Sequence, residues 1–401
     1  MVAPTGSGKT TNLCIPTALT WRHSFFCFDP KNELYALTAG WRSTFSRVIH
    51  LNPTSLTSDC MNPLTSIRLE TAYEMRDVRL VVEHLVDPEG EGTHGATAQH
   101  FQDLTKAFLQ GALLHGLYTN QACTLAEADA FFLSEATLDT VLQDMETTSH
   151  TLNGCHPAVQ RAVHLLRRLA DRELSGVLST CARALEMTTD PLVARMSNSD
   201  SFTMADLREC WQPLSLYLTI PYADQQRLRG LSRLITHQVL DYTTHRLGGW
   251  QHRMLLLIDE FQALKRMPAL ADALNYVRGF GLNMVLITPS LNEIDRLYGP
   301  SNNFIEGSHL RVVFTPNDPA IAEKFSRMTG TRTHEEGTRT HEERLLSTTG
   351  VAFLPAYKGL LLIGNGGYPA LITKAPYYTN ARLRRRSRMV RAIQPHGGPR
   401  L

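Results

Sequence analysis

Short apolar runs that end in polar or acidic residues recur in the first and last parts of the chain. Such runs are typical of strands buried on both faces of a parallel sheet. Stretches with helical spacing separate several of them, and this alternation predicts a mostly parallel sheet covered by helices. The expected strands lie in residues 24–30, 47–53, 214–221, 254–259, 284–287, 312–314 and 360–363.

The middle of the chain has a different pattern. From about residue 69 to residue 185, apolar residues recur at helical spacing and strand signals are almost absent. A segment of this length that contains only helices must bury its apolar stripes within a domain of its own. We therefore expect an α/β protein with an inserted all-α domain. The expected parts are residues 1–68 and 189–380 of the α/β domain, residues 69–188 of the all-α insertion and a basic tail at residues 381–401.

Three helices of the α/β parts are expected to have recognisable limits. A helix over residues 11–19 contains Pro16, which should kink it. A second helix over residues 31–39 should end at Gly40, and a third should run from residue 269 to residue 278.

The first residues of the chain have the composition of a phosphate-binding loop. Residues 3–10 read APTGSGKT, with Ala3 where the usual pattern begins with glycine. The two glycines let backbone N–H groups surround a β-phosphate, and the following helix contributes its positive dipole end. Lys9 would reach the β- and γ-phosphates, and the Thr10 hydroxyl would ligate Mg²⁺. The expected nucleotide-binding residues are Thr5, Gly6, Ser7, Gly8, Lys9 and Thr10.

A glycine-rich turn before a helix also arises by chance, so this motif needs a partner. Residues 254–261, MLLLIDEF, form an apolar run that ends in two acids. Ligands of parallel sheets bind at the carboxyl ends of the strands. Asp259 would hold Mg²⁺, and Glu260 would act with Lys9 in catalysis by polarising the attacking water. About 250 residues separate the two motifs, against about 30 for one βαβ unit, so the insertion divides the site. The predicted cofactors are ATP and Mg²⁺.

Only Met1 and Val2 precede the phosphate loop. A loop of this type normally follows a buried strand, and without that strand its neighbours would be unpaired and the loop poorly anchored. The sequence is therefore interpreted as an N-terminally truncated product or a start assigned too late.

Composition limits the compartment and the partners. The chain has 401 residues, 43% hydrophobic and 19% charged, with a net charge of +2. This balance conceals a strongly basic segment at residues 382–391. The preferred interpretation of the segment is a solvated tail, and the alternative is that it binds the phosphates of DNA. Seven scattered cysteines without C-x-x-C spacing indicate a reducing cytoplasm. No signal peptide and no apolar run of about 20 residues is present, so the chain as given is expected to be soluble.

The heptad GTRTHEE occurs at residues 330–336 and again at residues 337–343. Its histidines and glutamates suggest a metal site, but the H-E-x-x-H spacing is absent. We interpret the repeat as a small duplication in a tolerant surface loop.

Several motifs together resemble the TraG/TraD-type coupling proteins of conjugation and type IV secretion. They follow one another in order over nearly the whole chain, which makes the resemblance more specific than the phosphate loop alone. The motifs are APTGSGKT, FCFDPKNELYALTAGWR, VIHLNP with a later NPL, HFQDLTKAFLQGALLH, LSLYLTIPYAD, LLLIDEF, ALNYVRGFGLNMVLITPSLNEIDRLYG, RVVFTPND and GYPALITKAPYY.

The resemblance implies a homo-hexameric, RecA-like P-loop ATPase with an all-α insertion. It implies recruitment of a relaxase complex or effector and passage of single-stranded DNA to the components of a type IV secretion channel. It places such proteins at the cytoplasmic face of the bacterial inner membrane through N-terminal segments that this sequence does not contain.

One departure from the family pattern and one unassigned arginine concern turnover. After the strand at residues 284–287, the family usually has a glutamine that senses the γ-phosphate, whereas here Pro289 lies between Thr288 and Ser290. Either hydroxyl would have to substitute, or hydrolysis is impaired. Arg278 and Arg311 are candidates for an arginine supplied to a neighbouring subunit, and we assign neither.

Two alternatives stay open. One is a different P-loop DNA translocase, against which the all-α insertion argues. The other is a truncated docking adaptor that does not hydrolyse ATP, which Ala3, Pro289 and the absent first strand favour.

Overall fold

The computed structural model describes residues 1–92, 95–120, 123–132, 138–336, 339–364 and 366–391. Its contacts divide the chain into two compact units. The first unit comprises Met1–Val48, Leu207–Tyr217 and the residues from Thr243 onward, and the second comprises Ile49–Asp206 and Leu218–Tyr242.

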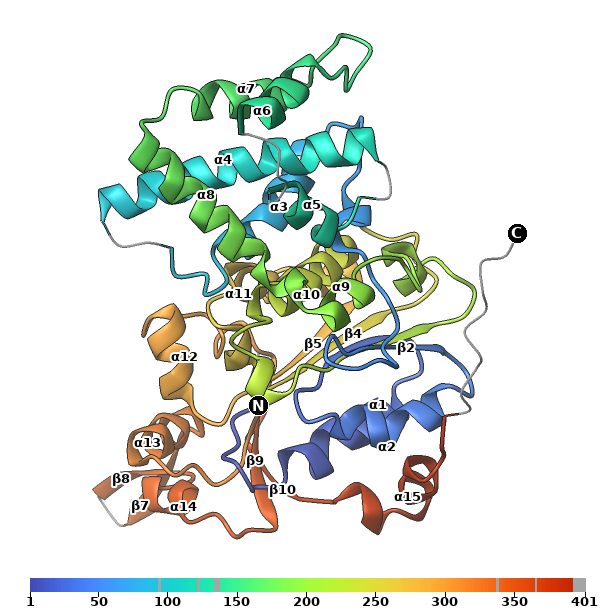
Figure 1. The fold of residues 1–401 in the computed structure, drawn as a ribbon. Coiled ribbons are helices and arrows are strands. Elements are labelled where there is room, and N and C mark those ends of the chain that lie inside the picture. The colour runs from blue at the N-terminus through green and yellow to red at the C-terminus, as the bar shows by residue number, and fades with distance from the viewer. Residues whose placement is uncertain (93–94, 121–122, 133–137, 337–338, 365, 392–401) are drawn as a thin grey trace. The chain divides into compact units, whose positions relative to one another are not determined.

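A five-stranded sheet with the order β2-β3-β1-β4-β5 forms the centre of the fold (Figure 1). Strand β4 pairs in parallel with β1 on one side and with β5 on the other. The apolar runs of the sequence therefore predicted these strands correctly, and the α/β fold class is confirmed. The strands are β1 (Ser24–Phe28), β2 (Arg47–Leu51), β3 (Leu214–Leu218), β4 (Met254–Asp259) and β5 (Leu282–Ile287).

The helix expected around Pro16 consists of two pieces. A π-helical turn, η1 (Thr10–Cys14), leads into α1 (Ile15–Thr20), and Pro16 lies in the first turn of α1. The missing N–H of a proline costs nothing there, because the first N–H groups of a helix have no partner within it. Helix α1 packs on the sheet in an apolar cluster that includes Leu19, Phe25 and Leu257.

The predicted stop at Gly40 is wrong, because α2 (Glu33–Arg42) continues through it. A Cβ built at Gly40 would lie 1.7 Å from the carbonyl oxygen of Met389. This glycine thus allows a close approach of the chain beyond α15 (Ala381–Ser387) and does not end a helix. The helix expected over residues 269–278 is also shorter than predicted, since α11 (Pro268–Ala273) gives way to the 3₁₀ turn η7 (Val277–Phe280).

Two of the expected strands belong to a separate antiparallel sheet. Strand β9 (Lys358–Ile363) pairs antiparallel with β6 (Leu310–Val313) and with β10 (Ala370–Thr373). The sequence did not predict β10, whose four residues are half-buried or exposed and include only three consecutive apolar residues. The helices packed around this part are α12 (Leu291–Tyr298), α13 (Pro319–Met328) and α14 (Thr348–Ala352).

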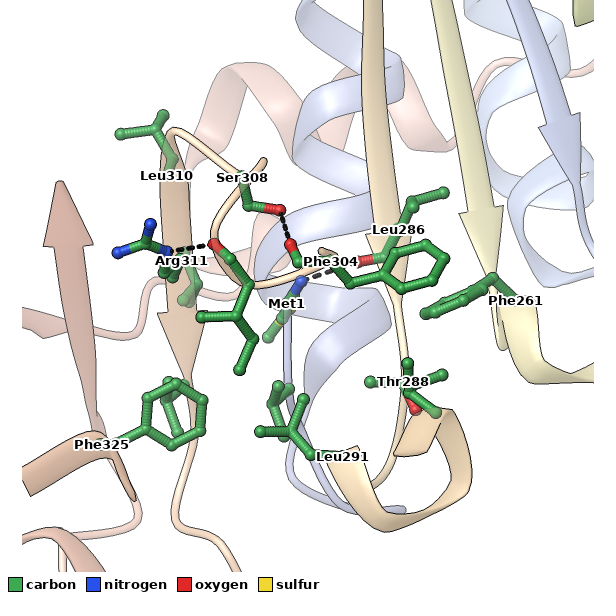
Figure 2. Close-up of a pocket in the computed structure, with 15 residues that line it drawn as sticks. Met1, Phe261, Leu286, Thr288, Leu291, Phe304, Ser308, Leu310, Arg311 and Phe325 are labelled. Carbon is green, nitrogen blue, oxygen red and sulfur yellow. Dashed lines mark hydrogen bonds between the residues drawn. The ribbon is translucent and has the colours of Figure 1, made fainter. Parts of the chain in front are cut away.

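The chain start lies between the two sheets. Val2 forms parallel bridges with Thr288 beyond β5 and with Val313 of β6. The Met1 ammonium donates a 2.7 Å hydrogen bond to the Leu286 carbonyl, beside a small, mostly apolar cavity of about 50 Å³ (Figure 2). Burial lowers the pKa of this amino group to about 6. These contacts anchor the following loop on both sides, whereas the sequence had led us to expect poor anchoring.

The repeated heptad forms a hairpin, so its assignment to a loop is wrong. Strand β7 (Thr331–Glu336) pairs antiparallel with β8 (Arg339–Arg344), and residues 337–338 between them lie outside the described residues. Alternating threonine and charged residues suit a strand with two polar faces. No group of three His, Cys, Asp or Glu side chains that would hold a metal ion occurs in the described part of the chain.

The second unit is mainly helical. Its longest helix, α4 (Ala96–Thr119), packs against α3, α7 and α8 (Figure 1). At the crossing with α7, a Cβ on Gly111 would lie 2.4 Å from the Cβ of Ala162, so glycine is needed for this contact. None of the helices in the described ranges is long and apolar enough to cross a lipid bilayer. The other helices are α3 (Glu74–Val86), α5 (Leu125–Phe132), α6 (Leu138–Thr147), α7 (Pro157–Leu166), α8 (Asp171–Leu185), α9 (Pro191–Met196) and α10 (Arg229–Thr244).

Candidate functional site

The candidate site lies in the first unit, where the phosphate loop meets the end of β4. Gly6 and Gly8 have φ angles of 79° and 85°, a conformation that strains residues with a Cβ. A Cβ on Gly8 would also lie 2.7 Å from the side-chain nitrogen of Asn12, which donates a hydrogen bond to the Gly8 carbonyl. Ala3 is fully buried and donates to the Thr288 carbonyl at 3.0 Å, so this position is extended and does not require glycine.

Lys9 connects the two motifs that the sequence separates. Its side chain is only 4% exposed, and its Nζ lies 3.0 Å from Glu260 Oε1 and 3.7 Å from Asp259 Oδ1. A buried ammonium needs such compensation, since transferring it from water without a partner is costly. The structure therefore brings together the lysine and both acids that the sequence predicted for one site.

Asp259 has the environment expected of a metal ligand. It is 3% exposed, and burial raises the pKa of its carboxyl group against the lowering effect of Lys9. Its Oδ1 is buried and accepts no hydrogen bond from the described residues. A carboxylate oxygen together with the nearly buried Thr10 hydroxyl gives the hard oxygen ligands that Mg²⁺ prefers. The residues present thus fit the predicted metal.

Glu260 is held in an unusual backbone conformation. Its φ angle is 66° and its ψ angle 54°, in the left-handed region, immediately before the 3₁₀ turn η6 (Phe261–Leu264). For a residue with a Cβ this conformation costs roughly 1–2 kcal/mol and is often found at functional sites. Its carboxylate also accepts a 3.1 Å hydrogen bond from Lys31 Nζ. Lys9 and Lys31 therefore share one carboxylate oxygen of Glu260.

Sequence reasoning did not identify Lys31 and Asp29 as site residues. Both follow β1, the strand beside β4, so the strand-end rule that selected Asp259 also applies to them. Asp29 is 1% exposed, and burial raises the pKa of its carboxyl group to about 6.

The opposite wall of the site comes from the end of the chain. Lys374, just after β10, donates a 3.1 Å hydrogen bond from Nζ to the Ser7 carbonyl. Its ammonium lies 3.9 Å from the centre of the Phe314 ring, and burial lowers its pKa. Together with Tyr357 and Tyr378 it lines a cavity of about 630 Å³ whose other side is the phosphate loop. No spacing rule in the sequence links a residue more than 360 positions away to the loop.

The residues expected to assist turnover are placed less favourably. Thr288 Oγ1 is hydrogen-bonded to the Ser290 carbonyl at 2.8 Å, and Ser290 Oγ accepts from the backbone of Asn292 at the start of α12. Both hydroxyls thus have local partners. Arg311 Nε donates to the Ile305 carbonyl beside the cavity at the chain start (Figure 2), whereas Arg278 is exposed in η7.

The chain is similar to known proteins of conjugative DNA transfer. The family model for type IV secretory system conjugative DNA transfer matches residues 1–389. The chain is 34% identical to the conjugal transfer protein TraG of Escherichia coli, over 82% of this chain and 54% of the relative. It is 24% identical to the protein VirD4 of Agrobacterium fabrum, over 96% of this chain and 59% of the relative.

A structure of the plasmid coupling protein TrwB in complex with ADP and Mg²⁺ has a similar fold. Its TM-score is 0.71 at 19% identity, and the match covers 93% of this chain and 84% of that one. The chain spans little more than half the length of the curated relatives it matches. With its divided nucleotide motifs, its helical unit and these likenesses, the chain belongs to the TraG/VirD4-type coupling protein family of conjugative DNA transfer.

Proposed function

We propose that this chain is the ATP-binding and ATP-hydrolysing part of a coupling protein that drives conjugative DNA transfer. The observation that supports this most is the buried cluster of Lys9, Asp259 and Glu260 at the phosphate loop. A buried lysine with two acids, beside a loop of inward-facing N–H groups, is the arrangement that phosphoryl transfer requires. The ADP and Mg²⁺ bound to TrwB support the choice of ligands.

The proposed roles follow from these positions. The loop Thr5–Thr10 and the Lys9 ammonium bind the β- and γ-phosphates, with the Ser7 N–H donating instead to the Pro4 carbonyl at 3.1 Å within the loop. Thr10 and Asp259 would hold Mg²⁺, which would neutralise charge on the phosphates when bound. Glu260 accepts the proton of the attacking water as general base, because its carboxylate is nearly buried at the end of β4 beside the phosphate loop.

The ion pairs of Glu260 suggest how a nucleotide would act on it. Lys9 and Lys31 both contact Glu260 Oε1, at 3.0 and 3.1 Å, so two cations hold the carboxylate that would receive the proton. A triphosphate that takes Lys9 leaves Glu260 with Lys31 alone, which is 36% exposed and thus more screened by water. Nucleotide binding would therefore activate the base.

The partners are proposed from family membership. The protein would act as a homo-hexamer at the cytoplasmic face of the bacterial inner membrane. It would receive a relaxase with its single-stranded DNA, or an effector, and pass it to components of the secretion channel. The helical residues 69–188 would recognise this cargo, and residues 1–68 with residues 189–380 would form the motor. Deleting residues 70–185 should abolish relaxase binding and leave ATP binding intact. Survival of both binding activities after the deletion would contradict this division of roles.

A non-hydrolysing adaptor is the second candidate. The local hydrogen bond that the Thr288 hydroxyl donates to the Ser290 carbonyl supports it, because this proton is then not available to the γ-phosphate and Pro289 itself has no donor. DNA-stimulated ATP hydrolysis by the wild-type protein that disappears in Lys9→Ala would support the motor. Absence of hydrolysis in both proteins, with retained relaxase binding, would support the adaptor.

A further inference from the structure

The basic residues near the C-terminus are fixed on the first unit and do not form a free tail. Helix α15 lies beside α1 and α2 (Figure 1). Arg386 Nη1 donates a 2.7 Å hydrogen bond to the Leu19 carbonyl, and its guanidinium lies 4.2 Å from the centre of the Trp41 ring. Leu383 packs against the apolar cluster of the sheet. The sequence-based interpretation as a solvated tail is thus wrong for residues 381–391, whereas residues 392–401 lie outside the described ranges.

The chain beyond α15 is fixed as well. The Met389 carbonyl lies against Gly40, where no other residue would leave room for it. Arg391 donates one hydrogen bond to the Val48 carbonyl at 2.9 Å and another to the Tyr35 hydroxyl at 3.1 Å. The neighbouring arginines are therefore displayed from a rigid backbone, which lowers the entropy lost when they bind a partner.

The arginines that do not face the core form one exposed set, which we call the arginine surface. Arg22 joins it through its guanidinium, which lies over the rings of Trp41 and Phe45 at 4.8 and 4.7 Å. Among the described residues, no member forms an ion pair with an acid. The arginine surface consists of Arg22, Arg382, Arg384, Arg385 and Arg388.

Packing does not explain this concentration of charge. Within the described residues 381–391, the guanidinium groups of Arg386 and Arg391 donate to backbone carbonyls. Burial and the neighbouring Arg382, Arg22 and Arg385 all lower the pKa of Arg386, so the cations are close enough to repel one another. Exposed like charges three or four residues apart on one helix destabilise it. An anionic partner would relieve that repulsion.

We propose that the arginine surface binds the phosphate backbone of single-stranded nucleic acid. Guanidinium groups suit phosphate because they donate two parallel hydrogen bonds. A lipid surface fits less well, since a helix that binds lipid needs a free apolar face and Leu383 of α15 is packed inward. The inference rests on the proposed function and adds the surface by which the motor unit contacts its DNA.

The test compares two sets of four substitutions in the full chain. The surface variant is Arg382→Gln, Arg384→Gln, Arg385→Gln and Arg388→Gln together. The control variant removes the same amount of charge from exposed arginines that lie in the first unit but outside the arginine surface. Its substitutions are Arg253→Gln, Arg296→Gln, Arg327→Gln and Arg332→Gln. Fluorescence anisotropy of a labelled oligonucleotide of mixed sequence measures affinity between about 50 and 200 mM salt. Unchanged thermal unfolding and unchanged binding of fluorescent ATP show that each variant is folded.

The expected result is a salt dependence that becomes shallower in the surface variant alone. Each phosphate contact contributes about 0.7 to the slope of log K against log salt, so four lost contacts reduce the slope by up to about 3. Equal affinity and slope in wild type and surface variant would overturn the proposal but not the proposed function. Absence of oligonucleotide binding by the wild type would overturn both. Sedimentation with phosphatidylglycerol vesicles tests a lipid site. If the wild type and the control variant sediment with the vesicles, the surface variant does not, and DNA binding is unchanged, the surface binds lipid and the proposal is overturned.

Discussion

Replacing Lys9 with alanine should destabilise the first unit as well as weaken nucleotide binding. In the structure its ammonium is buried between Glu260 and Asp259 at 3.0 and 3.7 Å. Removing one partner of a buried ion pair leaves an uncompensated charge and typically costs 3–5 kcal/mol. Lys31 still contacts Glu260 in the variant, so we expect a loss of about 3 kcal/mol near pH 7.5.

This loss should depend on pH in a defined direction. Burial already raises the pKa of Asp259, and removal of Lys9 raises it further. A carboxyl group with a raised pKa in the folded state is neutral below that pKa and becomes a destabilising buried charge above it. The destabilisation of Lys9→Ala should therefore shrink as pH falls toward 4 and grow as pH rises through the raised pKa.

Urea unfolding followed by tryptophan fluorescence measures the effect, because all four tryptophans lie in the first unit. The matched control is Glu260→Gln, alone and combined with Lys9→Ala. The combined variant should lose less stability than the sum of the two single losses, by about 1–3 kcal/mol, since the second change removes the unpaired charge. Equal stability of Lys9→Ala and wild type at pH 7.5, or strict additivity, would refute this reasoning.

Three further predictions concern single residues around the site. Asp29→Asn should stabilise the protein by about 3 kcal/mol at pH 8 and by little at pH 4. The reason is that a carboxyl pKa of about 6 in the folded protein, in place of 3.8, penalises folding only as pH rises. The same difference in urea midpoint between variant and wild type at both pH values would contradict this prediction. Lys374→Ala should weaken binding of fluorescent ATP about tenfold, because it removes a charged contact at the phosphate loop. Lys374→Arg should retain most of the affinity. An affinity of Lys374→Ala equal to that of the wild type would exclude a role of Lys374 in ATP binding. Gly40→Ala should lower the free energy of unfolding by about 1–3 kcal/mol and expose residues 388–391 to protease, because the new Cβ would overlap the Met389 carbonyl. Protease resistance equal to that of the wild type would show that this contact is dispensable.

Local patterns predicted the strands and the nucleotide motifs because both depend on residues close in sequence. Buried parallel strands such as β4 have uninterrupted apolar runs, and the end of such a strand identifies Asp259 and Glu260 without knowledge of the fold. The strand-end rule also applies to Asp29 and Lys31, so these residues were within reach of sequence reasoning.

Long-range packing decided what the sequence did not predict. Gly40 looked like a helix stop, but its role depends on a chain segment about 350 residues later. Lys374 reaches the phosphate loop only because β10 joins the small antiparallel sheet. Likewise, the arginines near the C-terminus have the composition of a solvated tail, and only the docking of Arg386 and Leu383 makes them a fixed surface.

The most direct test of the central claim separates ATP binding from ATP turnover at Glu260. Binding of fluorescent ATP with Mg²⁺ and steady-state hydrolysis in the presence of single-stranded DNA would be measured for wild type and Glu260→Gln. If Glu260 is the general base, the variant binds ATP within about threefold of wild type and hydrolyses it at least about 100-fold more slowly. Hydrolysis at the wild-type rate by Glu260→Gln, or failure of the wild type to bind ATP, would contradict the account.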